Sequence, residues 1–267
     1  MTSPILTIIL LGIIEGLTEF LPVSSTGHLI LASTLLGFEG ESSIAFKIAI
    51  QLGAILAVVV AYWGRFWNVA KGLTVADKQA IAFTRNILIG FLPAMLIGAF
   101  AYDAIRAALQ TPMLVAVMLV VGGILILLIE RMVKEERFTS VEGMPTRTAI
   151  AIGIVQCLAM VPGVSRSGAT IMGARLMGVE RKTAAEFSFF LAVPTMLGAT
   201  VYALYKDRDL LTFDDVGAIA LGLFISFLVA LAVVKAFVAI VSRYGFGPFA
   251  WYRIVLGSVA MVWLYLR

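Results

Sequence analysis

The stretch GIIEGLTEFLPVSSTGHLIL (residues 12–31) decides how this chain folds. It is apolar enough to lie in a membrane, yet it contains Glu15, Glu19 and His28, which is the only histidine in the sequence. An ionised side chain at the centre of a bilayer costs roughly 2.5–3.5 kcal/mol or more. Ionisable residues at that depth therefore indicate a functional site, and the rest of the chain is interpreted around them.

The whole sequence of 267 residues is apolar, with 61% hydrophobic residues, 13% charged residues and a mean hydropathy of +1.03. Several segments reach the roughly 20 residues that a membrane-spanning helix requires. We expect one all-α integral membrane domain over residues 1–267, with no soluble domain and, since residues 1–4 lack Lys and Arg, no cleaved signal peptide. The single Cys157 excludes an intramolecular disulfide, and the modest net charge of +4, mostly in loops, indicates a topology signal and no nucleic-acid binding.

The first 36 residues are predicted to enter the membrane without crossing it. A helix over 3–21 leads to a polar turn bracketed by Pro22 and Gly27, and the following segment 28–36 is too short to span a bilayer. Non-helical backbone at membrane depth is tolerated only inside protein or beside a cavity. Residues 3–36 are therefore predicted to form a re-entrant helix-loop-helix.

Residues 147–177 are predicted to form a second re-entrant segment, broken around Pro162 and Gly168. The remaining apolar runs are long and lack the period-two alternation of strands, so each is predicted to be a transmembrane helix. The six predicted spans are 44–63, 85–103, 111–130, 184–205, 215–236 and 248–266.

The chain contains an internal repeat at an offset of 141 residues, which aligns 12–31 with GIVQCLAMVPGVSRSGATIM (153–172). Seven of the twenty aligned positions are identical without a gap. Each half, about 1–140 and 141–267, then holds a broken helix pair and three spans. Three is an odd number, so the halves are predicted to lie in opposite orientations, as an inverted-topology repeat with its site between them.

The positions of Lys and Arg set the expected orientation, because cytoplasmic loops carry an excess of them. Thirteen are predicted on one side and five on the other, which makes the first side cytoplasmic and leaves both termini exterior. The thirteen are Arg65, Lys71, Lys78, Arg85, Arg131, Lys134, Arg137, Arg147, Arg175, Arg181, Lys182, Lys235 and Arg243, and the five are Lys47, Arg106, Lys206, Arg208 and Arg267.

Glu15 and Glu19 lie four residues apart and share one helix face. Two like charges in an apolar setting repel each other unless a cation, a proton or water lies between them. Carboxylate oxygens suit a hard cation such as Mg²⁺ or Ca²⁺ better than zinc, so we expect these two residues to bind a metal ion or a proton. In the alternative, both glutamates reach solvent at a helix end.

The hydroxyl residues Ser24, Ser25 and Thr26 occupy the first turn. Each of them could simply satisfy backbone groups that the turn frees. His28 follows at once, and a hydroxyl beside an imidazole is the minimum for an activated nucleophile. We therefore expect Ser25 and His28 to be catalytic, while a hydrogen-bonded core histidine is the alternative for His28.

The second turn, PGVSRSGAT (162–170), offers an arginine with hydroxyls and glycines. A turn of this kind at a helix start presents backbone N–H groups to an oxyanion, and Arg suits bidentate contact with phosphate. In the alternative, Arg166 only pairs with Glu15 or Glu19 and holds the halves together. The residues expected to bind a substrate phosphate are Gly163, Ser165, Arg166, Ser167, Gly168 and Thr170, with Ser24 and Thr26 from the first turn.

The two copies of the repeat differ in their chemistry. Gln156, Met160 and Ala169 stand where the first copy has Glu15, Glu19 and His28, so one turn supplies acids, hydroxyls and imidazole and the other supplies a cation. A separate ionisable residue, Arg253 in the last predicted span, is expected to reach the membrane surface or to pair with Glu186.

The segments EGLTEFLPVSSTGH (15–28) and PGVSRSGAT (162–170) resemble the two hallmark motifs of the BacA-type undecaprenyl-diphosphate phosphatases, the bacitracin-resistance family. The resemblance covers the whole chain and implies a hydrolase of the bacterial cytoplasmic (inner) membrane. Its reaction would convert undecaprenyl diphosphate to undecaprenyl phosphate and inorganic phosphate, recycling the cell-wall lipid carrier and conferring bacitracin resistance. The resemblance also implies a divalent cation and a site that opens to the exterior. The functional positions that it implies are Glu15, Glu19, Ser25, His28, Ser165, Arg166 and Thr170.

The residues and the resemblance together suggest a mechanism. Arg166 and the 163–168 backbone hold the diphosphate, Ser25 attacks the terminal phosphorus or positions water, and His28 handles the proton. Glu19, with Glu15, binds the cation or orients His28.

A lipid-phosphate flippase is the competing interpretation, because inverted repeats with broken helices are typical of transporters. The expected partner is a membrane lipid in either case. The sequence leaves a homodimer open.

Overall fold

The computed structural model describes residues 4–38, 41–109, 111–133, 135–206 and 215–266, and these residues are almost entirely helical. No strand occurs among them, and the only bridge is an isolated one between Phe138 and Val179. Lys134, Arg208 and Arg267 of the predicted loop charges lie outside the described residues. The elements are α1 (Pro4–Thr18), α2 (Ser25–Leu36), α3 (Glu41–Ala61), α4 (Trp63–Thr74), α5 (Lys78–Ala108), α6 (Pro112–Met132), α7 (Thr146–Gln156), the 3-10 helix η1 (Cys157–Met160), α8 (Arg166–Leu176), α9 (Arg181–Lys206), α10 (Asp215–Tyr244) and α11 (Gly247–Leu266).

Five helices in the described part of the chain are long and apolar enough to cross a membrane: α5, α6, α9, α10 and α11. A sixth candidate is the pair α3 and α4, which bends by 70° at its junction. The six predicted spans coincide with α3, α5, α6, α9, α10 and α11. The short apolar helices α1, α2 and α7–η1 correspond to the two segments predicted to be broken. The chain is thus an all-α multi-pass membrane protein.

The two breaks lie earlier in the sequence than predicted. The first helix ends at Thr18 and α2 begins at Ser25, so Gly27 lies inside α2 and does not close the turn. In the second break α8 begins at Arg166, and Gly168 likewise lies inside the helix. The reason is local, because a serine just before each helix caps it and so fixes where the helix starts.

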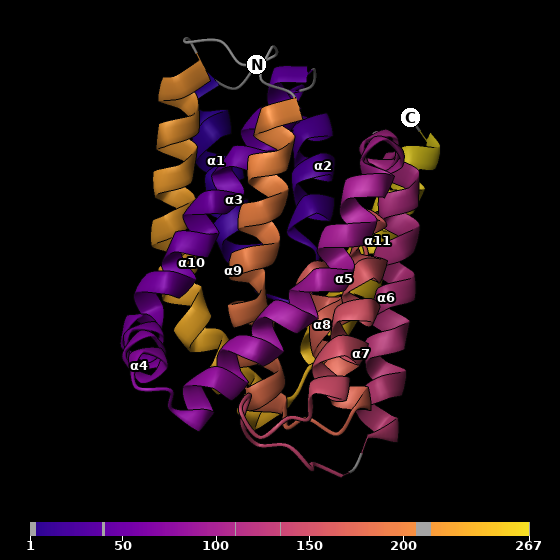
Figure 1. Cartoon of the computed structure of the whole chain (residues 1–267). Coiled ribbons are helices and arrows are strands. Elements are labelled where there is room, and N and C mark those ends of the chain that lie inside the picture. The colour runs from indigo at the N-terminus through magenta and orange to yellow at the C-terminus, as the bar shows by residue number, and fades with distance from the viewer. Residues whose placement is uncertain (1–3, 39–40, 110, 134, 207–214, 267) are drawn as a thin grey trace.

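The helix ends sort into two groups (Figure 1). The N-terminus and C-terminus lie at one end of the molecule, and the 133–145 connection between α6 and α7 lies at the other. Helix α4 leaves α3 near that second end, and its Trp63 and Trp67 are more than half exposed, with their rings stacked 6.3 Å apart. The arrangement agrees with the predicted separation of both termini from the basic loops.

Close helix packing depends on glycines between α1 and α10. A Cβ atom at Gly16 would lie 2.6 Å from the carbonyl oxygen of Ser226, and one at Gly12 would lie 2.9 Å from that of Gly222. Lipid tails are as apolar as leucine, so helices in a membrane associate through such close van der Waals contact between small residues. The first half of the chain is thereby packed directly against the second.

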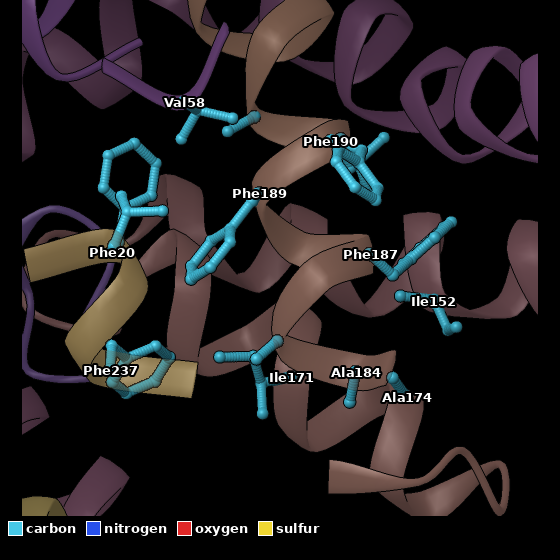
Figure 2. Packing of buried hydrophobic residues seen from close by; sticks show 14 of the residues in the cluster. Phe20, Val58, Ile152, Ile171, Ala174, Ala184, Phe187, Phe189, Phe190 and Phe237 are labelled. Atoms are coloured by element: carbon cyan, nitrogen blue, oxygen red, sulfur yellow. The ribbon is translucent and has the colours of Figure 1, made fainter. Parts of the chain in front are cut away.

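The main hydrophobic core surrounds α9 and is rich in phenylalanine (Figure 2). Phe189 meets Phe20 edge-to-face, with ring centroids 5.2 Å apart, and also packs against Phe237 of α10. Phe20 belongs to the non-helical break between α1 and α2 and is fully buried. The core therefore anchors the first break as well as the long helices.

Arg253 of α11 connects the two breaks. Its side chain is only 1% exposed, and the described carboxylates make no ion pair with it. The sequence-based expectation that it reaches the surface or pairs with Glu186 is wrong, because its five N–H groups donate instead to backbone carbonyls of α6 and of both breaks. The acceptors are Leu119 at 3.2 Å, Met118 at 3.0 Å, Pro22 at 2.9 Å, Val164 at 2.9 Å and Gly163 at 2.8 Å.

Replacing this guanidinium is expected to destabilise the protein. In Arg253→Met, the three break carbonyls of Pro22, Gly163 and Val164 lose their donor. Because an unsatisfied buried group costs about 1–3 kcal/mol, we expect the free energy of unfolding to fall by about 3 kcal/mol or more. Arg253→Lys, with three donors, should recover only part of it. Thermal unfolding in detergent measures the effect, with the exposed Arg243→Met as control, and an Arg253→Met protein as stable as the wild type would contradict it.

Candidate active site

The two breaks have the same backbone geometry at equivalent positions of the repeat. Ser24 and Ser165 are both in the left-handed region, with φ of 69° and 79°. Each caps the helix that follows, since its hydroxyl accepts a hydrogen bond from the amide three residues later, at 3.2 Å in Gly27 and 3.0 Å in Gly168. A non-glycine residue with positive φ is strained, and such strain concentrates at functional sites.

A cavity of about 800 Å³ lies between α2, α3, α5 and α9 and reaches the starts of α2 and α8. The N-terminus of a helix carries a partial positive charge and free backbone N–H groups, so two such ends at one cavity favour an anion. Seven of the predicted site residues line it, and the rest of its wall is mainly apolar. The seven are Glu19, Ser24, Ser25, Thr26, Gly163, Ser165 and Arg166.

Arg166 reaches from the second break to the first. Its Nη2 donates to Oε1 of Glu19 at 2.9 Å, and its Nη1 donates to the carbonyl oxygen and the hydroxyl of Ser188 at 2.8 and 3.1 Å. The guanidinium also lies over the ring of Phe20, 5.7 Å from its centroid. The ion pair with Glu19 matches the interpretation in which Arg166 holds the halves together, and the same guanidinium still faces the cavity.

Glu19 is the meeting point of the site. Its Oε1 accepts from Arg166, and its Oε2 accepts a short hydrogen bond from the Ser25 hydroxyl. Glu19 and Ser25 are both buried, at 6% and 5% exposure. A carboxylate that accepts the hydrogen bond of a hydroxyl can also take its proton, so the geometry makes Glu19 the base nearest to Ser25.

His28 points away from Ser25 and is not among the described residues that line the cavity. Its Nδ1 lies 2.8 Å from the carbonyl oxygen of Ser24, and its Nε2 lies 2.7 Å from the hydroxyl of Tyr252, whose ring stacks on the imidazole. A carbonyl only accepts, so Nδ1 carries the proton and Nε2 of the neutral ring accepts from Tyr252. The hydroxyl–imidazole pair expected from the sequence is therefore not formed.

Glu15 lies one helical turn before Glu19, is fully buried and does not line the cavity. Neither of its carboxylate oxygens has a hydrogen-bond partner among the described residues. No cluster of three or more metal-ligating His, Cys, Asp or Glu side chains occurs in the part of the chain that the structure describes. Glu15, whose two oxygens are unused, still fits a hard cation or a shared proton together with the neighbouring Glu19.

Ser167, Gly168 and Thr170 support the backbone and do not line the cavity. Ser167 donates to the carbonyl oxygen of Leu21 at 2.7 Å, which is a second direct link between the breaks. Thr170 donates to the carbonyl oxygen of Arg166 at 2.8 Å. These residues therefore stabilise the 162–170 turn from outside the cavity.

Sequence reasoning did not identify Ser188 or Tyr252. Ser188 lies in an apolar run of α9, and Tyr252 is one of two tyrosines in a predicted span. Neither has a motif around it, and each meets its partner only through the fold, 22 residues away for Ser188 and 224 for Tyr252. Nothing in the sequence alone gives that proximity.

Known proteins similar to this chain cover its whole length. The family model described as bacitracin resistance protein BacA matches residues 8–259. A protein from Sphingopyxis alaskensis named undecaprenyl-diphosphatase is 76% identical over 258 residues, which are 97% of each chain. Proteins named undecaprenyl-diphosphatase from Rhizorhabdus wittichii and undecaprenyl-diphosphatase 2 from Paramagnetospirillum magneticum are 58% and 53% identical, covering 100% and 97% of this chain and 100% and 98% of their own lengths.

Proposed function

The chain belongs to the bacitracin resistance protein BacA family, and from that premise we propose how it acts as an undecaprenyl-diphosphatase. It hydrolyses the phosphoanhydride bond of undecaprenyl diphosphate, giving undecaprenyl phosphate and inorganic phosphate. The observation that carries the mechanism is the Ser25–Glu19–Arg166 arrangement at the bottom of a largely apolar cavity. The flippase interpretation is not favoured, because the relatives are named for hydrolysis.

The terminal phosphate binds at the starts of α2 and α8, beside Arg166. Glu19 takes the Ser25 proton, the Ser25 oxygen forms a bond to the terminal phosphorus, and the bond to the bridging oxygen breaks, which releases undecaprenyl phosphate. Water then attacks the phosphorus of the phosphoserine, the bond between phosphorus and the Ser25 oxygen breaks, and Glu19 returns its proton to that oxygen as inorganic phosphate leaves. Positioning and charge stabilisation supply most of the catalysis of phosphoryl transfer, and the preformed contacts of Arg166 and Glu19 provide both.

The remaining site residues act by positioning. His28 holds the strained Ser24 through its carbonyl and thereby orients Ser25, and Ser165, Ser167 and Thr170 do the same for the Arg166 turn. The lipid tail lies against the apolar cavity wall, where Phe91 and Met95 of α5 offer hydrophobic contact without polar recognition.

We propose an inverted-topology repeat with six spans and two re-entrant pairs, α1–α2 and α7–α8. Three features support it: the equivalent capping serines, the packing of α1 on α10 and of α7 on α5, and the loop charges. The protein would lie in the bacterial cytoplasmic (inner) membrane with the cavity open to the periplasm, since its lining includes the α5 and α9 ends near both termini. A homodimer stays a prediction.

Removing the nucleophile or the base is expected to abolish phosphate release. Ser25→Ala should lower kcat at least about 10³-fold, Glu19→Gln about 10²- to 10⁴-fold, and Arg166→Ala should raise KM as well. His28→Ala should lower kcat about tenfold, and His28→Asn should restore most of this loss, because the asparagine amide can still donate to the Ser24 carbonyl. Phosphate release from undecaprenyl diphosphate in detergent is the assay, and the exposed Ser242→Ala is the control.

Two results would contradict this assignment. A His28→Asn protein as inactive as Ser25→Ala would make the imidazole the base. Unchanged turnover in Arg166→Ala would show that Arg166 does not bind the terminal phosphate during the reaction. Acid quenching followed by detection of phosphoserine separates attack by Ser25 from attack by a water that Ser25 positions.

We propose that Glu15 and Glu19 hold a divalent cation, Mg²⁺ or Ca²⁺, which would offset the charge of the paired carboxylates and of the diphosphate. EDTA should then stop turnover, and adding back either cation should restore it. Glu15→Gln should weaken cation binding at least tenfold, measured as the loss of the thermal stabilisation that the cation gives the wild type in detergent. If neither EDTA nor added cation changes the turnover or the thermal stability, no cation is bound, and the two carboxyls share a proton instead.

The proposed orientation predicts the labelling of single cysteines in a Cys157→Ser background. Thr111→Cys, in the α5–α6 turn, should react with a membrane-impermeant maleimide in intact cells, whereas Ser140→Cys, in the 133–145 connection, should react only after permeabilisation. The reverse pattern would invert the topology and place the cavity mouth on the cytoplasmic side.

A further inference from the structure

Gln156 occupies the repeat position of Glu15 but faces the cavity that Glu15 does not reach. It is the last residue of α7, where the helix gives way to η1, and only 2% of it is exposed. The proposed mechanism gives it no role. A polar side chain buried this deeply normally has all its hydrogen-bonding groups paired.

The amide of Gln156 keeps at least one N–H without an acceptor. Its Nε2 has no partner among the described residues, and its Oε1 lies 3.4 Å from the Thr170 hydroxyl. That hydroxyl has one proton, which goes to the carbonyl oxygen of Arg166 at 2.8 Å.

A second unused donor belongs to another residue of the cavity wall, Arg166. The Nη atoms of Arg166 are engaged by Glu19, Ser188 and Met196, but its buried Nε has no partner. Both donors belong to residues of the cavity wall in the second half of the repeat, and both nitrogens are buried within that wall, so each side chain must turn toward the cavity to meet a bound anion. Donors without acceptors in a buried wall are complementary to an anion with several oxygens, such as a phosphoryl group.

We propose that Gln156 is a further substrate-binding residue, whose N–H donates to a non-bridging oxygen of the terminal phosphate while Arg166 Nε donates to another. This inference rests on the proposed function and adds a contact to it. It also explains the asymmetry of the repeat, because a carboxylate at 156 would face the phosphate and repel it, whereas the carboxylate at 15 is turned away from the cavity.

Orthophosphate is the probe, because it isolates the phosphate contact from the lipid tail. We expect Gln156→Met, which keeps the length and loses the donor, to weaken orthophosphate binding about 10- to 100-fold, as for one hydrogen bond to a charged group. Gln156→Glu should weaken it more than 100-fold. Calorimetric titration of the purified protein in detergent gives Kd, and competitive inhibition of phosphate release gives Ki.

Gln51→Glu is the matched comparison, since it adds the same charge to the same cavity from α3. The inference requires that Gln156→Glu raise the Kd for orthophosphate at least tenfold more than Gln51→Glu does. Orthophosphate Kd values within threefold of the wild type in both Gln156 variants would overturn the inference. If one variant does not fold, judged by thermal unfolding, the other decides. A wild-type protein that binds orthophosphate but releases none from undecaprenyl diphosphate would refute the proposed function. The titrations of the Gln156 variants would then still decide whether Gln156 contacts phosphate.

Discussion

One buried guanidinium without a carboxylate partner, that of Arg253, sets the relative positions of everything in the site. A broken helix leaves carbonyl groups without their amide partners, and in a membrane no water can replace them. Three of the five N–H groups of Arg253 are used on such carbonyls, in Pro22, Gly163 and Val164 of the breaks, and the other two donate to carbonyls within α6. The fork of the guanidinium is rigid and planar, so it fixes distances as well as satisfying polar groups.

On that framework the two halves bring different chemistry to equivalent positions. The serine corners at 24 and 165 are alike in φ and in capping, but the residue that follows each is a hydroxyl in one half and a guanidinium in the other. Glu19 accepts hydrogen bonds from both, so the Ser25 hydroxyl, the proposed nucleophile, and the Arg166 guanidinium are held by a single carboxylate. The ion pair that would merely fasten the halves is at the same time the contact that prepares Ser25.

The long helices and the location of the site could be predicted from the sequence, because hydropathy reports length and the motifs report residue types. The rotation of a side chain about its helix axis could not. His28 was expected beside Ser25, yet its ring bonds to the Ser24 carbonyl and to Tyr252, 224 residues away. Arg253 was expected at the surface for the same reason, since its five acceptors are backbone carbonyls and no side-chain pattern marks them.

The bend of 70° between α3 and α4 has a consequence for the depth of the protein in the bilayer. Helix α4 has no buried residue, and it carries exposed tryptophans with Lys71 over the ring of Trp67. Such a helix rests along the headgroups of its leaflet, because indole rings favour that level. In the proposed orientation α4 would fix the depth of α3 in the bilayer. The distance that a diphosphate headgroup moves from the opposite leaflet to the site would then depend on the thickness of the bilayer.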